Sequence, residues 1–147
     1  PAALSELRRV LRRGGRLVLG VWGPLDRNPL VASMHATFGP FLGDDVAAAM
    51  QGPCGFPDPA ELGVLLTEAG FTGVQVEAHE KTAEHPDARA AMDGQLDALP
   101  IVSAVQSLGP RRTELVEAMC SYHQAATSPD GSLRLPAVSN VAVATNP

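Results

Sequence analysis

Residues 6–22, which read ELRRVLRRGGRLVLGVW in one-letter code, decide the fold. Apolar side chains from Leu4 to Leu11 recur at the spacing of one helix face, and arginines occupy the other faces. The helix is expected to end at Arg13, because Gly14-Gly15 can adopt a left-handed turn. The run Leu17 to Trp22 is continuously apolar, which is typical of a strand buried on both faces in the middle of a parallel sheet. The stretch therefore predicts a helix, a tight turn and a central strand of an α/β protein.

The composition narrows the class of protein. The chain has 147 residues, 45% of them hydrophobic, and a net charge of −5. This charge argues against nucleic acid or an anionic membrane as the main partner, because both attract positive fields. No apolar run approaches the roughly 20 residues that span a bilayer. Cys54 and Cys120 lack the spacing of a zinc site or a disulfide framework, so no metal and a cytoplasmic location are expected. The start at Pro1 is expected to reflect a cut from a longer chain.

Residues 24–57 are rich in proline and glycine and differ from their surroundings. Two short helices are expected among them, over Leu30–Phe38 and Asp44–Met50. The segment is too long and too apolar for a simple connection, so it is interpreted as a helical lid within a domain that spans residues 1–147. Insertions of this kind commonly carry specificity.

The rest of the chain alternates again between helix and strand signals. Asp58 is a suitable N-cap and Pro59 a suitable first helical residue, with Gly70 ending that helix. Phe71 to His79 alternates as a half-buried strand. Further helices are expected over residues 86–98, 101–108 and 112–124. A turn at 129–131 precedes a final strand over 141–144.

Three segments in this order resemble the second half of a class I methyltransferase of the ubiquinone-biosynthesis type, dependent on S-adenosylmethionine. The first is similar to the family's helix, glycine turn and fifth strand, with Arg13 where proline is usual. The second is similar to the following helix and its "EAGF" entry into the next strand. The third is similar to the closing strand. The segments are Glu6–Leu19, Phe56–Phe71 and Val141–Ala144.

The resemblance implies the C-terminal half of a Rossmann-like sheet, from the fifth to the seventh strand, with the last strand antiparallel between the other two. It also implies a parent enzyme that transfers a methyl group to a small-molecule acceptor. The glycine-rich turn that approaches the cofactor in such folds is absent from the sequence, so no cofactor-binding or catalytic residue is assigned. The chain alone is therefore expected to be inactive. The alternative is a non-catalytic binding or assembly module derived from a methyltransferase.

Four residues are candidates for contact with the methyl acceptor, because the family binds it near the end of the fifth strand. Trp22 could stack on a planar or cationic substrate, or it could be a core or rim aromatic residue. His35, with Met34 and Phe38 nearby, could line a pocket or act as a base, or it could be a surface histidine or one whose hydrogen bonds are satisfied. Both interpretations stay open for each residue.

Two surface features complete the expectations. Arginines at 8, 9, 12, 13 and 16 form the only basic cluster, which either contacts phosphates or is a solvated helix face. The histidines at 79, 85 and 123 are expected to be ordinary surface residues. Without a fourth strand beside it, the Leu17–Trp22 strand would expose one edge, so self-association is expected.

Overall fold

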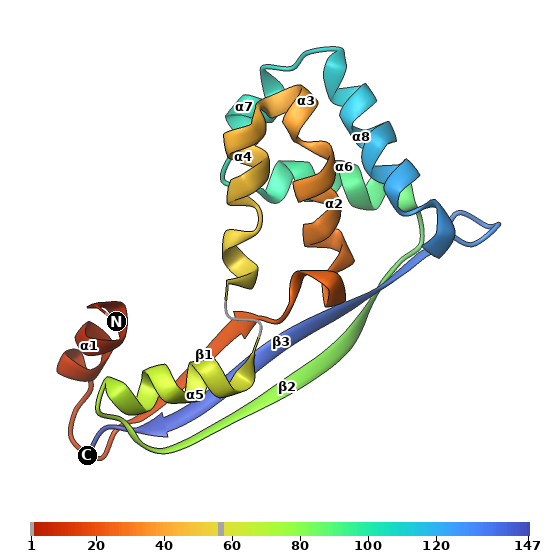
Figure 1. The fold of residues 1–147 in the computed structure, drawn as a ribbon. Coiled ribbons are helices and arrows are strands. Elements are labelled where there is room, and N and C mark those ends of the chain that lie inside the picture. The colour runs from red at the N-terminus through yellow and green to blue at the C-terminus, as the bar shows by residue number, and fades with distance from the viewer. Residues whose placement is uncertain (1, 56–57) are drawn as a thin grey trace. The chain divides into compact units, whose positions relative to one another are not determined.

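A computed structural model describes residues 2–55 and 58–147 of the chain. Phe56 and Pro57, which belong to the expected lid and to the second resembling segment, lie outside the described residues. The protein is mixed α/β and divides into two compact units (Figure 1). Unit 1 comprises Pro1–Arg27, Pro53–Lys81 and Val138–Pro147, and unit 2 comprises Asn28–Gly52 and Thr82–Ala137.

The sheet has three strands in the order β1-β3-β2. β1 (Arg16–Trp22) pairs antiparallel with β3 (Leu133–Thr145). β2 (Thr72–His85) runs antiparallel to β3 as well, since the Thr72 hydroxyl at its start donates to the Thr145 carbonyl at the end of β3, 3.4 Å away. The last strand therefore lies between the other two, as expected for these three strands. β2 and β3 are longer than expected, and each contributes residues to both units.

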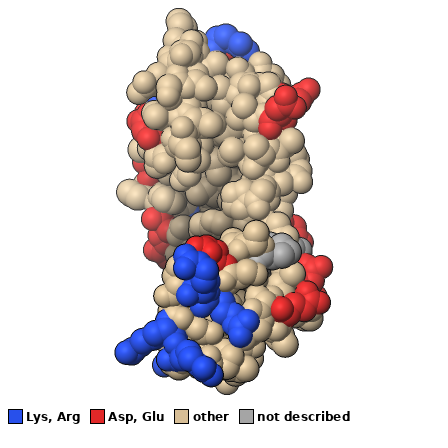
Figure 2. Space-filling view, turned by 90° about the vertical axis from the view of Figure 1, so that its left-hand side faces the viewer, with Lys and Arg blue, Asp and Glu red and all other residues tan. Residues whose placement is uncertain are grey.

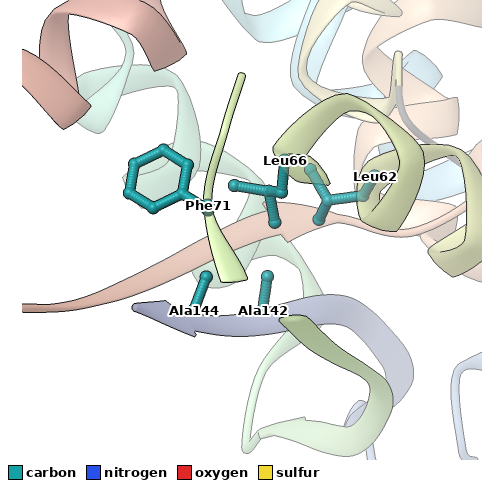
Figure 3. Close-up of a cluster of buried hydrophobic side chains, with 5 residues drawn as sticks. All are labelled: Leu62, Leu66, Phe71, Ala142 and Ala144. Atoms are coloured by element: carbon teal, nitrogen blue, oxygen red, sulfur yellow. The ribbon is translucent and has the colours of Figure 1, made fainter. Parts of the chain in front are cut away.

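Two helices of unit 1 pack on one face of the sheet. α5 (Pro59–Glu68) begins as predicted, with the Asp58 carboxylate accepting from the Ala60 amide at 2.8 Å. α1 (Ala2–Val10) has no fully buried residue, and a short 3-10 turn, η1 (Leu25–Arg27), follows β1. The core of this unit places β3 alanines beneath α5 leucines, with an aromatic ring beside them (Figure 3). Its buried members are Leu62, Leu66, Phe71, Ala142 and Ala144.

The end of α1 is capped by a residue from the far end of the chain. Asn146 is 6% exposed, and its side-chain amide donates to the carbonyls of Leu11 at 2.6 Å, Arg8 at 3.2 Å and Arg12 at 3.4 Å. The Arg8 carbonyl belongs to the last turn of α1, where helical donors are lacking, and those of Leu11 and Arg12 follow the helix directly. The Arg12 carbonyl also accepts from the Gly15 amide at 2.9 Å. Because the Asn146 backbone also pairs with Gly14 and Gly15, one residue ties the helix, its glycine turn and the sheet together.

The prediction that β1 is buried on both faces is wrong for this structure. Its residues alternate between half-buried and exposed positions. Leu17, Leu19 and Val21 face α1 and α5, whereas Val18 is 66% exposed on the other face. The apolar run indicates a strand suited to burial on both faces, but within the described part of unit 1 helices cover only one.

Unit 2 is helical. The segment expected to form a lid contributes three helices, α2 (Pro29–Thr37), α3 (Gly39–Leu42) and α4 (Asp44–Ala49). α2 and α4 lie close to the two predicted helices, whereas α3 was not predicted. These helices group with the later ones in the same compact unit. η2 (Gly52–Cys54) lies at the boundary between the two units. The later elements are α6 (Ala88–Ala98), α7 (Val102–Gln106), α8 (Arg111–Tyr122) and η3 (Gln124–Ala126).

Apolar packing and one ion-pair network hold the later helices of unit 2 together. The side chains of Leu96, Leu115 and Met119 are completely buried. Arg112 of α8 makes ion pairs with Asp93 and Asp97 of α6. Across residues 2–55 and 58–147, no helix has the length and apolar character needed to cross a membrane.

Candidate functional site

His35 lies on α2 and is half-buried, and both of its ring nitrogens have partners. Nδ1 is 2.9 Å from the Ala47 carbonyl oxygen of α4, which can only accept, so Nδ1 carries the proton and donates. Nε2 then accepts from the Gln51 side-chain amide at 2.6 Å. The ring therefore joins α2 to α4 and to the turn after it. A role as a base would require Gln51 to move away from Nε2.

Met34 and Phe38 lie near His35 in sequence but are buried in unit 2. Met34 is 4% exposed and Phe38 is not exposed at all. With Val31 they form an apolar stripe along α2 and its C-cap, at the three- and four-residue spacing of a helix face. In this structure their side chains contact the interior of the unit, so contact with a substrate would require its helices to separate.

Trp22 occupies a different setting from the other three candidates. It is the last residue of β1 in unit 1, opposite Ser139 of β3, and 43% exposed. Met34, His35 and Phe38 all belong to unit 2, so the structure brings these three together on one helix and assigns Trp22 to the other unit. Binding of the methyl acceptor by these four residues stays a prediction.

On the sheet face opposite α1 and α5, apolar residues of β1 and β3 form a strip that we call the open strip. Cross-strand pairing places Val18 opposite Val143 and Gly20 opposite Val141, with Trp22 at the end of the row. Val18 and Trp22 are exposed, and the two β3 valines are half-buried. The free edge of β1 borders this strip, since β3 is the one strand paired with β1 in the described sheet. Exposed apolar surface next to an unpaired strand edge is typical of an interaction surface.

His123 was expected at the surface but is buried, at 3% exposure. It follows Leu115 and Met119 at four-residue spacing, so the helical stripe of α8 continues through it. Nε2 has no hydrogen-bond partner among the residues that the structure describes, and burial lowers the pKa of the ring. The spacing is the signal that would have revealed this burial from the sequence.

The surroundings of the two cysteines disfavour a reactive thiolate. Both are free thiols, and burial raises the pKa of Cys54 and of Cys120, which disfavours the thiolate. The described residues also contain no group of three His, Cys, Asp or Glu side chains able to hold a metal ion. The sequence matches no known family model and no curated protein. Membership of the methyltransferase family is therefore a proposal argued from the residues and the fold.

Proposed function

We propose that this chain is the C-terminal half of an S-adenosylmethionine-dependent methyltransferase that acts on a small molecule. The observation that carries the proposal is the mismatch between β1 and its surroundings. Its outward residues, Val18, Gly20 and Trp22, are as apolar as the inward ones, yet the outward face is open. A strand of this composition suits an interior position with cover on both faces. Further strands and helices beside β1 would provide that cover.

The connection from α1 to β1 supports the same interpretation. A helix that packs on a sheet and leads directly into a strand fits the second part of a β-α-β crossover, in which the first strand runs parallel to the second. In the proposed domain that first strand would pair with the free edge of β1. Leu7 and Val10 of α1, which are 37% and 62% exposed, would then lie under the added elements. The order β1-β3-β2, with the last strand antiparallel in between, also fits the closing half of such a sheet.

We assign the site for S-adenosylmethionine to the complementary half of the proposed domain. Such a site uses a glycine-rich turn between a strand and a helix, where the backbone can approach the ligand. Gly14 lies in a turn between a helix and a strand, the reverse order. Gly23 follows β1, but a Cβ there would lie 2.8 Å from Val138 Cγ1, so its small size serves packing. Cofactor binding is therefore assigned to the complementary half, and no catalytic step is derived from this chain.

Calorimetric titration of S-adenosylmethionine tests the proposal. The purified 147-residue chain should give no binding heat. The same chain, extended at its N-terminus by the segment encoded upstream in its reading frame, should bind the cofactor. Micromolar binding by the 147-residue chain alone would overturn the assignment. So would an extended protein that folds but neither binds the cofactor nor contains a glycine-rich turn. That second result would favour the non-catalytic assembly module.

A further inference from the structure

A hollow in unit 1 is lined mainly by arginines and polar groups. It lies beside α1 and the end of β3 and has a volume of about 540 Å³. Five arginines and one carboxylate, that of Glu6, lie within residues 1–16, which gives this segment a net charge of +4 in a chain whose total is −5. Figure 2 shows Lys and Arg side chains gathered close together on one face of the molecule. The lining residues are Ser5, Arg8, Arg9, Arg13, Asn146 and Pro147.

The pairing of arginines separates this cluster from the rest of the chain. Each arginine outside it has a carboxylate or carbonyl partner. These contacts are Arg27 with Glu80, Arg89 with Glu117, Arg111 with the Pro40 carbonyl, Arg112 with Asp93 and Asp97, and Arg134 with Glu84.

Inside the cluster, Glu6 pairs with Arg9 through both of its oxygens, at 2.7 and 2.9 Å. The guanidinium groups of Arg12, Arg13 and Arg16 make no ion pair or hydrogen bond within residues 2–55 and 58–147. Positive charge without a protein counter-charge is therefore concentrated here.

Arg8 is held in place at the border of this hollow. Its Nε donates to the Asn146 side-chain oxygen at 3.4 Å, and its Nη1 to the Ala69 carbonyl at 3.5 Å. Its guanidinium lies against Gly70, where a Cβ would be 2.5 Å from Nη1. These contacts fix the plane of the group and leave Nη2 with no described partner. A guanidinium held in this way loses less conformational entropy when it binds an anion.

The negative end of α1 is also neutralised at this place. Helix C-termini repel anions because their last carbonyls are unsatisfied. The Asn146 amide donates to the Arg8 carbonyl in the last turn and to the carbonyls of Leu11 and Arg12 just after it. The field in the hollow is therefore dominated by the guanidinium groups.

We propose that this hollow binds the phosphate group of a small phosphorylated ligand, with Arg8 and Arg13 as its main contacts. Planar guanidinium groups donate paired hydrogen bonds to phosphate oxygens. Glu6 offsets one of the three lining arginines, so Arg8 and Arg13 supply the remaining positive side-chain charge of the lining. The excess negative charge of the rest of the chain disfavours an extended nucleic acid. The site lies apart from the open strip and does not depend on methyl transfer.

Calorimetric titration with sodium diphosphate tests the site on the 147-residue chain. The substitution Arg13→Gln should weaken binding by roughly tenfold or more, because it removes a charge-assisted hydrogen bond. The Arg13 side chain is exposed and makes no hydrogen bond or ion pair with the described residues, so this variant should keep the fold. Arg134→Gln is the matched control, since it removes the same charge from a site in unit 2 where Glu84 pairs with it. It should leave the affinity unchanged within about twofold.

A second arm separates a free phosphate compound from a lipid headgroup. Phosphatidylcholine vesicles with and without a phosphatidylinositol monophosphate are sedimented with each variant. Diphosphate binding without vesicle binding assigns the site to a soluble ligand. Vesicle binding that needs the phosphoinositide and is lost in Arg13→Gln assigns it to a headgroup. Absence of binding in both arms would overturn the proposal. So would equal losses in Arg13→Gln and Arg134→Gln, or tighter binding of a short RNA than of diphosphate.

Discussion

Replacement of Asn146 by alanine should destabilise unit 1 far more than the loss of an ordinary residue near a chain end. The amide makes its three hydrogen bonds to the end of α1 in an almost fully buried position. A hydrogen bond contributes about 0.5–1.5 kcal/mol net, and the two amide hydrogens of Asn146 serve all three carbonyls. Since α1 has no fully buried residue, apolar packing offers little compensation. We expect a loss of about 2 kcal/mol in the free energy of unfolding of unit 1.

Urea denaturation followed by tryptophan fluorescence measures this loss, because Trp22 is the single tryptophan and belongs to unit 1. Asn146→Asp is the matched variant, since it keeps the shape and the acceptor for Arg8 but directs a carboxylate at the helix carbonyls. It should destabilise the unit at least as much as Asn146→Ala at neutral pH. A change below about 0.5 kcal/mol in Asn146→Ala, or a neutral effect of Asn146→Asp, would refute the capping role.

Three further predictions concern the other described features. Burial lowers the pKa of His123 in the folded protein, so the unfolded chain binds a proton at this residue more readily. The neutral ring contributes fully to stability above about pH 6.5, the ordinary pKa of histidine. This contribution is lost as the pH falls from there through the lower pKa of the folded state. The urea midpoint by circular dichroism should therefore fall on acidification, and His123→Leu should flatten that dependence. Val18→Glu places a charge on the open strip, so light scattering should show an associated wild-type chain and a monomeric variant. The variant should lose less than about 1 kcal/mol in stability, because residue 18 is exposed. A wild-type chain that is already monomeric would contradict this prediction. Arg112→Ala removes the ion pairs with Asp93 and Asp97 and should lower the free energy of unfolding of unit 2 by about 0.5–1 kcal/mol. The loss is small because both carboxylates are exposed and screened by solvent. An unchanged midpoint in urea denaturation would show that the two ion pairs contribute nothing.

Local signals in the sequence predicted most helix and strand positions. The N-cap at Asp58 with Pro59 placed the start of α5, and the glycine turn placed the start of β1 at Arg16. These features succeed because caps and turns depend on neighbouring residues. The Asn146 cap could not be predicted this way, because its partners lie about 135 positions earlier in the chain.

The candidate site was harder to predict than the fold. Met34 and Phe38 were chosen for their position after the fifth strand of the resembling family, yet their spacing with Val31 is that of a helix face that packs inward. His35 was chosen for its chemistry, but its role depends on Ala47 and Gln51, whose proximity the sequence does not reveal. Sequence patterns predict which face of a helix is apolar, whereas the partners of a polar side chain depend on tertiary packing.

The sequence of β1 predicts burial on both faces, whereas one face is exposed in the structure. The free energy that each exposed apolar side chain would contribute on burial indicates what could cover this face. Full burial of a valine contributes about 1.5–3 kcal/mol, and Val18 is 66% exposed, so covering it would add on the order of 1 kcal/mol. Leu7, Val10 and Trp22 would each add a comparable amount. An added half-domain of the same chain would gain this contribution without the free-energy cost of bringing two molecules together, which separate copies must overcome. Two copies would also bring two arginine-rich helices, each in a segment of net charge +4, into one assembly. Both differences favour completion of the sheet by a covalently joined half over a symmetric dimer.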